Sequence, residues 1–153
     1  MKNKHLSYDN RLEIEKGLKE NLSFKQIGKN IGKDCTTVAK EIKNHIIFKN
    51  SGAIGRPFFD CCNRNNCQFR IKGTKCNTKI CPHYRQEICT KLSKAPYVCN
   101  GCSKKNNCTL SKKIYDASYA QNEYKNKGVL LDSLYFFVLL RRDRDSNPRY
   151  PKV

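Results

Sequence analysis

A short break, Gly32-Lys-Asp34, interrupts a helical pattern near the start of this chain, and it constrains the fold more than any other feature. Before the break, apolar residues recur at the spacing of one helix face: Phe24, Ile27 and Ile31. After the break, Val38 and Ile42 stand four residues apart. Two helices joined by so short a turn must cross closely, and the pattern therefore predicts a helix-turn-helix.

The residues at the helix ends agree with these boundaries. Ser23 and the glutamine three residues later have the spacing of a capping box, and Asp34 can cap the next helix by accepting hydrogen bonds from backbone amides. Gly28 offers the small residue that is wanted where the two helices meet. Ser7 can begin an earlier helix. We therefore predict three short helices around one core in residues 1–48, a homeodomain-like arrangement.

In such a domain the outer face of the third helix enters the major groove of DNA. The candidates for DNA contacts on this face are Lys33, Thr36, Thr37, Lys40 and Lys43. A threonine can contact a thymine methyl group or accept a hydrogen bond, whereas the lysines are suited to phosphates. Each residue also has a simpler interpretation, since the threonines could complete the helix cap and the lysines could be ordinary solvated charges.

The charge of the chain fits a polyanionic partner. Its 31 Lys and Arg residues oppose 13 Asp and Glu residues, for a net charge of +18, which favours nucleic-acid binding through counterion release. The first thirty residues show no signal-peptide pattern. The apolar run at 129–140 is shorter than the roughly 20 residues of a membrane span and contains Asp132. We expect double-stranded DNA as the partner, no membrane contact and a cytoplasmic location.

Ten cysteines in a chain without a secretion signal favour metal ligation over disulfides. Nine of them lie in residues 61–108, together with ten basic residues and one acidic residue. Cys99-Asn-Gly-Cys102 has the spacing with which two thiolates hold one tetrahedral zinc ion. The predicted cofactor is structural Zn²⁺, and disulfides or unliganded thiols remain as alternatives. The predicted ligands are Cys61, Cys67, Cys76, Cys81, Cys89, Cys99, Cys102 and Cys108.

Two parts of this segment echo each other. Both run from an aromatic residue through a cysteine pair to Asn-Asn-Cys, at 59–67 and at 97–108. The echo suggests two similar metal loops. His83 could equally be a ligand or a solvated loop residue. Cys35, which lies in the helix-turn-helix, is expected to be a small buried side chain or the first residue of the third helix, and not a ligand.

Apolar residues at helical spacing follow the cysteines: Leu110, Ile114, Ala117, Ala120 and Tyr124. They predict an amphipathic helix from Ser111 to Lys127 that packs on the cysteine segment, on a missing domain or on another subunit. A stretch containing Gly, Ser and Pro near residue 50 marks a boundary. The predicted organisation is mainly α. It comprises the helix-turn-helix at 1–48, a linker at 49–60, a loop-rich cysteine module at 61–108, the amphipathic helix at 109–127 and an aberrant tail at 128–153.

Several stretches carry a family resemblance: His5–Leu18, Ile31–Asn44 and Lys94–Cys102 with the following Lys113–Ala117. In these stretches the chain resembles the N-terminal part of IS30 family transposases, which are bacterial mobile-element enzymes. The resemblance implies a helix-turn-helix that binds the terminal inverted repeats of the element. It also implies a cysteine-containing middle and a later catalytic domain whose Asp, Asp and Glu hold two metal ions. The implied location is the bacterial cytoplasm, at the nucleoid when bound to DNA.

The resemblance ends near residue 127. Cys35 stands where the family often has proline, and Asp132, Asp143 and Asp145 match no family position. No three separated carboxylates that could hold two metal ions follow the match. The sequence therefore predicts a truncated, non-catalytic DNA-binding fragment that could compete with an intact transposase. A small zinc-dependent helix-turn-helix transcriptional regulator is the main alternative. An enzyme with a cysteine nucleophile and a remnant that does not fold are the others.

Overall fold

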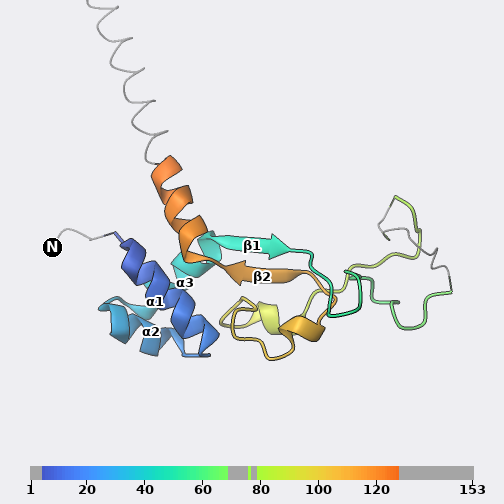
Figure 1. Ribbon diagram of the computed structural model, residues 1–153, viewed down its shortest axis with the longest axis horizontal. Coiled ribbons are helices and arrows are strands. Elements are labelled where there is room, and N and C mark those ends of the chain that lie inside the picture. The colour runs from blue at the N-terminus through green and yellow to red at the C-terminus, as the bar shows by residue number, and fades with distance from the viewer. Residues whose placement is uncertain (1–4, 69–75, 77–78, 128–153) are drawn as a thin grey trace, which may run out of the picture.

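Three short N-terminal helices, a two-stranded sheet, a long loop segment and a last helix make up the fold (Figure 1). The computed structural model describes residues 5–68, 76 and 79–127. The helices are α1 (Tyr8–Lys19), α2 (Phe24–Ile31) and α3 (Cys35–Asn44), and the strands are β1 (Ile46–Lys49) and β2 (Lys112–Tyr115). Two 3₁₀ turns, η1 (Thr90–Ser93) and η2 (Lys105–Asn107), interrupt the loops, and a last helix occupies residues 117–127. The fold is mainly α, as the sequence predicts.

The predicted helix ends are confirmed. Ser7 and Ser23 each cap a helix through a capping box, in which the serine hydroxyl accepts a hydrogen bond from a backbone amide three residues later. Gly32 ends α2 in the left-handed conformation, with φ of 63°. Asp34 Oδ1 accepts a hydrogen bond from the Thr36 backbone amide at 2.8 Å. A Cβ added to Gly28 would lie 2.5 Å from the Lys33 carbonyl oxygen, so the helix–turn contact requires glycine there.

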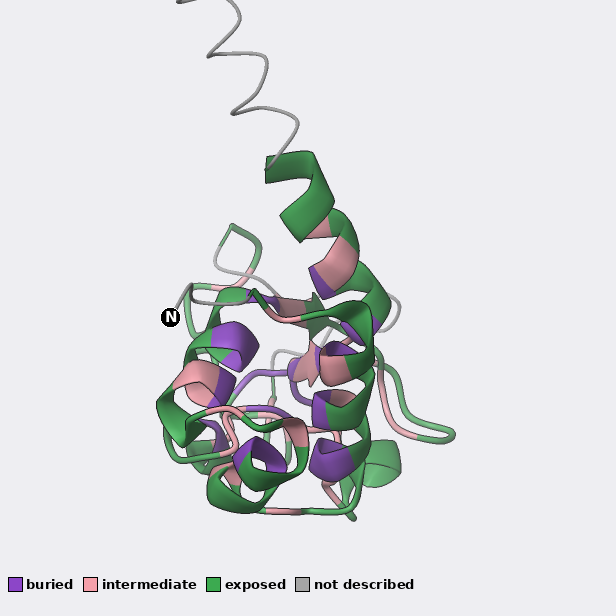
Figure 2. Cartoon of the chain, turned by 90° about the vertical axis from the view of Figure 1, so that its left-hand side faces the viewer, coloured by how far each residue is buried: buried purple, intermediate pink, exposed green. Residues whose placement is uncertain are grey.

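The core lies between the three helices and extends to residues far along the chain. Its fully buried helical members are Ile14, Leu18, Ile27, Val38 and Ile42. Figure 2 shows buried stretches on the sides of the helices that face one another. Val98, Tyr115 and Ala120 belong to the same cluster. Residues 5–45 and the segments near residues 98 and 115–120 therefore share one apolar core.

Strand β2 occupies part of the segment where the sequence predicts a helix. It pairs antiparallel with β1, with Ile46 opposite Tyr115 and Lys49 opposite Lys112. The predicted helix from Ser111 is therefore wrong over its first six residues, 111–116, and begins only at residue 117. The physical reason is a long-range contact, because the backbone of β2 pairs with the backbone of β1. The helix begins after this strand, where Asp116 Oδ1 caps it by accepting a hydrogen bond from the Tyr119 amide at 2.9 Å.

The last helix packs on α1 and α3, so its partner is none of the three expected from the sequence. Ala117 and Ala120 are fully buried, and the Ala117 amide donates a hydrogen bond to Glu15 Oε2 on α1 at 2.9 Å. Tyr8 and Ser118 are also joined through their hydroxyl oxygens, 3.1 Å apart. The helix thereby covers the back of the helix-turn-helix. The predicted tail at 128–153 lies outside the described residues.

The cysteine-containing loops are attached to this core through the segment before and within Cys99–Cys102. The Tyr97 ring lies 6.0 Å from the Phe24 ring, between centroids. Asn100 bonds the Tyr115 backbone in both directions, donating through Nδ2 at 2.7 Å and accepting through Oδ1 at 2.9 Å. Further along, the buried Lys112 ammonium donates to the Gly52 and Cys108 carbonyl oxygens at 3.0 and 2.9 Å. In the described part of the chain, no helix is long and apolar enough to cross a membrane.

Candidate nucleic-acid interface

The five predicted DNA-contacting residues lie on the turn before α3 and along α3 itself. Thr36, Lys40 and Lys43 are exposed, and Lys33 and Thr37 are half-buried. The opposite side of α3 is buried through Val38 and Ile42. The local sequence thus turns its apolar residues inward and leaves polar and basic ones on the outer face.

Thr36 takes part in the helix cap. Its backbone amide and its hydroxyl both donate to Asp34 Oδ1, at 2.8 and 2.6 Å. The hydrogen bond from the Thr36 side chain is the main reason that the pKa of Asp34 lies below its usual value of 3.8. The threonine hydroxyl therefore serves the cap, and its exposed position leaves the methyl group as the part suited to a thymine contact.

Lys40 and Lys43 differ in their surroundings. The Lys43 ammonium lies 4.4 Å from the centroid of the Tyr97 ring, which is a cation–π contact with the middle segment. Lys40 is exposed and forms no ion pair with any residue in the described ranges. Lys40 is therefore the more available of the two for a phosphate, whereas Lys43 joins α3 to the loop that carries the cysteines.

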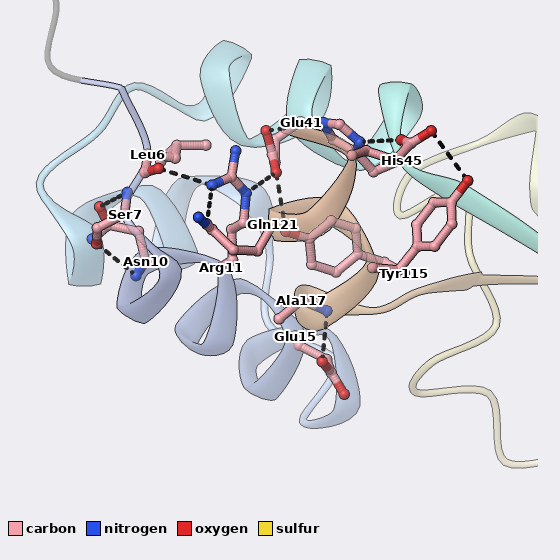
Figure 3. Close-up of polar contacts among 12 residues, drawn as sticks. Leu6, Ser7, Asn10, Arg11, Glu15, Glu41, His45, Tyr115, Ala117 and Gln121 are labelled. Carbon is pink, nitrogen blue, oxygen red and sulfur yellow. Dashed lines mark hydrogen bonds and ion pairs between the residues drawn. The ribbon is translucent and has the colours of Figure 1, made fainter. Parts of the chain in front are cut away.

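A buried polar network contacts α3 on the side opposite its exposed outer face (Figure 3). Arg11 of α1 donates from Nε to Glu41 Oε1 at 2.7 Å and from Nη1 to Gln121 Oε1 of the last helix at 2.6 Å. Tyr115 donates from its hydroxyl to the same Glu41 oxygen at 3.3 Å, and burial is the main cause that raises the Tyr115 pKa. The network connects α1, α3, β2 and the last helix, so it fixes the orientation of the outer face of α3.

His45 extends this network at the end of α3. Its Nε2 lies 3.6 Å from Glu41 Oε2, and its Nδ1 lies 2.7 Å from Glu123 Oε2 on the last helix. The hydrogen bond to His45 is the main reason that the pKa of Glu123 lies below its usual value of 4.5. The carboxylates of Glu41 and Glu123 therefore both take part in contacts between helices.

Sequence reasoning missed this network, although a signal for it exists. Arg11 precedes the buried Ile14 and Leu18 by three and seven residues, so it falls on the inward face of α1. Glu41 lies beside Ile42 and three residues after Val38, on the inward face of α3. A charge on each inward face, of opposite sign, indicates a buried ion pair.

Seven of the eight predicted metal-ligating cysteines line two separate cavities. The first, of about 250 Å³, is lined by Cys61, Cys67, Cys76, Cys81 and His83. The second, of about 460 Å³, is lined by Cys89, Cys99 and Cys102, together with Asn21 at the end of α1. None of the ten cysteines forms a disulfide. Cys62 and Cys35 are exposed and line neither cavity, and Cys35 is the first residue of α3, as one of its two predicted roles requires.

Cys108 lines neither cavity. Burial raises the pKa of the Cys99 thiol, and the nearby Cys102, Cys89 and Cys108 raise it further. Each of these three cysteines therefore lies close enough to Cys99 to affect its thiol electrostatically. Within the ranges that the structure describes, however, no three His, Cys, Asp or Glu side chains are arranged so that they could hold a metal ion. The zinc ligands stay a prediction.

Comparison with known proteins gives a match for the N-terminal segment alone. Neither the curated proteins nor the solved structures include a match to the chain. A model of the helix-turn-helix domain matches residues 2–45, which contain α1, α2 and α3. Residues 2–45 are therefore a helix-turn-helix domain of the kind that binds DNA and is typical of transposases.

Proposed function

We propose that this chain binds the terminal inverted repeats of an IS30-like mobile element through its helix-turn-helix, without cutting DNA itself. The observation that carries the proposal is the outer face of α3, where Thr36 and Lys40 are exposed in a domain that matches the helix-turn-helix family. The net charge of +18 favours a DNA partner and adds sequence-independent affinity. The choice of the terminal inverted repeats as the target rests on the resemblance of three sequence stretches to IS30 family transposases.

The α3 residues take different roles in this proposal. Thr36 and Thr37 lie in the first turn of α3, the part of a recognition helix that is nearest to the base edges. Lys40 and Lys33 contact phosphates and set the position of the domain on the duplex. Lys43 contacts the DNA phosphates less directly, because its ammonium also lies over the Tyr97 ring.

Occupation of the repeats has a consequence for an intact transposase of the same element. A chain that binds the ends and does not cleave them competes with that enzyme for its sites. We therefore propose that co-expression of this chain lowers the excision frequency of the element. An unchanged excision frequency, with the chain present in the cell at a concentration above its dissociation constant, would contradict this role.

The binding proposal is tested with the purified chain and DNA that carries the terminal repeats flanking its gene. Fluorescence anisotropy at physiological salt should give tighter binding to the repeats than to scrambled DNA of equal length. Equal affinity for both would contradict the proposal. Preferred binding to promoter DNA over the repeats would instead identify a transcriptional regulator.

Two variants separate base contacts from phosphate contacts. Lys40→Ala should weaken binding to repeat and scrambled DNA alike. It should also lower the slope of the logarithm of the binding constant against the logarithm of salt concentration by about one. Thr36→Ser keeps a hydroxyl for the Asp34 cap but removes the methyl group, so it should lower the preference for the repeats and leave nonspecific binding unchanged. Lys125→Ala, an exposed lysine of the last helix, is the control for Lys40→Ala because it removes the same charge away from α3.

A further inference from the structure

The turn at residues 94–97 lies against both helices of the helix-turn-helix. The Tyr97 amide donates a hydrogen bond to the Lys94 carbonyl oxygen at 2.9 Å, which closes the turn. The centroid of the Tyr97 ring lies 6.0 Å from that of Phe24, the first residue of α2, and 4.4 Å from the Lys43 ammonium near the end of α3. This turn therefore adjoins the two elements that are expected to meet DNA.

The position of the turn is fixed by its surroundings. Tyr97 has φ of 64°, in the left-handed region that a bulky residue rarely adopts. Val98, the next residue, is buried in the core that it shares with the three helices. The Cys99 amide then donates to the Lys113 carbonyl oxygen on β2 at 2.6 Å. These contacts hold the turn at a set place beside α2 and α3.

The segment that carries the turn offers little negative charge. Residues 46–115 contain only two acidic residues, Asp60 and Glu87. Asp60 is buried and accepts hydrogen bonds from two neighbouring side chains, each at 2.9 Å. Glu87 forms an ion pair with Arg64 of the same segment. Both carboxylates are thus engaged within the segment, so its other basic side chains determine the charge of its surface.

Two exposed lysines, Lys91 and Lys94, bring this positive charge to the turn. The Lys94 amide donates to the Lys91 carbonyl oxygen at 3.4 Å, and both residues line the cavity of about 460 Å³. A cavity of about 480 Å³ also borders the turn, and its lining includes Phe24 and Pro96. No acidic residue is among the lining residues of either cavity. The surroundings of the turn therefore favour an anionic partner.

We propose that this turn is a second DNA-contacting surface, at which Lys91 and Lys94 bind backbone phosphates beside the bases that α3 reads. In a docked helix-turn-helix the recognition helix lies in the major groove and the preceding helix crosses the backbone. Because the turn adjoins both α2 and α3, phosphates that flank the groove come toward it. Tyr97 is a positioning residue that holds the turn against Lys43. This inference rests on DNA binding by the helix-turn-helix, but not on the terminal repeats as the target.

Substitution of both lysines tests the contact in the full chain. The double variant Lys91→Ala with Lys94→Ala should weaken binding to repeat and scrambled DNA by the same factor, because phosphate contacts carry no sequence information. It should also lower the slope of the logarithm of the binding constant against the logarithm of salt concentration by about two. Lys125→Ala with Lys127→Ala removes the same charge from exposed positions of the last helix and should leave this slope nearly unchanged. Equal effects of the two double variants would overturn the proposal.

Lysine acetylation maps the same contact without any substitution. The unaltered chain is treated with N-hydroxysuccinimide acetate, free and saturated with DNA, and the modified peptides are identified by mass spectrometry. Lys91 and Lys94 should be protected by DNA, whereas Lys125 and Lys127 should react equally in both states. Equal modification of Lys91 and Lys94 with and without DNA would contradict the contact.

The role of Tyr97 has its own measurement. Tyr97→Leu removes the ring and should weaken binding to both DNAs, whereas Tyr97→Phe keeps a ring beside Lys43 and should retain the affinity of the unaltered chain. In the Lys91→Ala, Lys94→Ala background, Tyr97→Leu should cause a smaller further loss, because the phosphate contacts that it positions are already absent. An undiminished loss there would contradict the positioning role and leave the phosphate contacts in place.

Failure of this proposal is distinguishable from failure of the proposed function. Equal affinity of the unaltered chain for repeat and scrambled DNA would contradict the terminal repeats as target, and the lysine comparison would still be measured on either DNA. No DNA binding by the unaltered chain would contradict the proposed function itself. A preference for the repeats, combined with equal binding by the two double variants, would contradict the second surface alone.

Discussion

Arg11 and Glu41 form an ion pair inside the core, with Arg11 Nε and Glu41 Oε1 2.7 Å apart and with side chains only 2% and 9% exposed. The pair joins α1 to α3 across 30 positions of sequence. Further hydrogen bonds surround the pair, because the Tyr115 hydroxyl also donates to Glu41 and the Arg11 guanidinium also donates to the Leu6 carbonyl oxygen at 2.9 Å. Every buried side-chain polar atom in the described residues has a hydrogen-bond partner.

Removing one member of this pair should be costly. Arg11→Ala leaves the Glu41 carboxylate buried without its main partner, and we expect a loss of about 3–5 kcal/mol in the free energy of unfolding. The double variant Arg11→Met with Glu41→Leu should lose much less, because it leaves no uncompensated charge. Urea unfolding followed by circular dichroism measures both. Lys16→Ala, an exposed position of α1, should stay within roughly 0.5 kcal/mol of the unaltered chain. A loss for Arg11→Ala as small as that of this control would refute the prediction.

Tyr115 should contribute to the stability of the helix-turn-helix although it lies 70 residues beyond it. It is fully buried in the core cluster. Tyr115→Ala should lower the free energy of unfolding by about 3–5 kcal/mol, the range for truncation of a large buried aromatic side chain. Tyr115→Phe removes only the hydrogen bond to Glu41. It should lower the free energy of unfolding by about 1–3 kcal/mol, because the buried Glu41 carboxylate loses a donor. Tyr119→Phe, at an exposed position of the last helix, is the matched control; a Tyr115→Ala effect no larger than this one would count against the shared core.

Acid should weaken the contact between α3 and the last helix. The Glu123 pKa is lowered in the folded chain, mainly by its hydrogen bond to His45, from a usual value of 4.5. The stabilisation is therefore complete above about pH 4.5 and is lost as the pH falls through the lower folded pKa. Glu123→Gln should lose stability at neutral pH and show a flatter stability profile in acid. Glu13→Gln, an exposed residue of α1, should keep the original profile; superimposable profiles for the two variants would exclude the proposed linkage.

Gly101 should tolerate no side chain. A Cβ there would meet the Leu18 carbonyl oxygen at 2.5 Å and the Asn21 side chain even more closely. Gly101→Ala should therefore push the Cys99–Cys102 turn away from α1 and cost about 1–3 kcal/mol, as overpacking of a close contact does. Thermal unfolding of this variant and of the neighbouring Ser103→Ala provides the comparison, since Ser103 is exposed. Equal unfolding midpoints would show that the turn does not rest on α1.

The helix-turn-helix was predictable because its signals are local. Ser23, Gly32 and Asp34 act within a few residues of their own position, through capping and a left-handed turn. Strand β2 was not predictable in the same way, since its hydrogen-bond partners lie 60 or more positions earlier in β1. The helical spacing of Leu110 and Ile114 competed with that distant pairing, and the pairing prevailed.

The candidate DNA-contacting residues illustrate the same limit. The sequence places Thr36, Lys40 and Lys43 on α3, and the structure leaves all three exposed. The contact of Lys43 with Tyr97 joins positions far apart in the chain, and no pattern near either residue indicates it. The grouping of the cysteines into two cavities likewise depends on how the loops fold back. Spacing suggested two loops but could not show which of them rests on α1.

The pairing of β1 with β2 makes the whole region between residues 49 and 112 an insertion in a hairpin. The chain leaves the helical core along one strand, and it returns to the same core beside it (Figure 1). Loops closed by a fixed stem can change greatly in length at modest entropic cost, because the closure penalty grows only with the logarithm of length. Outside the segment at 97–102, which packs on the core, the loops of this region can therefore change in length at modest cost while the stem keeps Tyr115 and the last helix in register with the helices they complete.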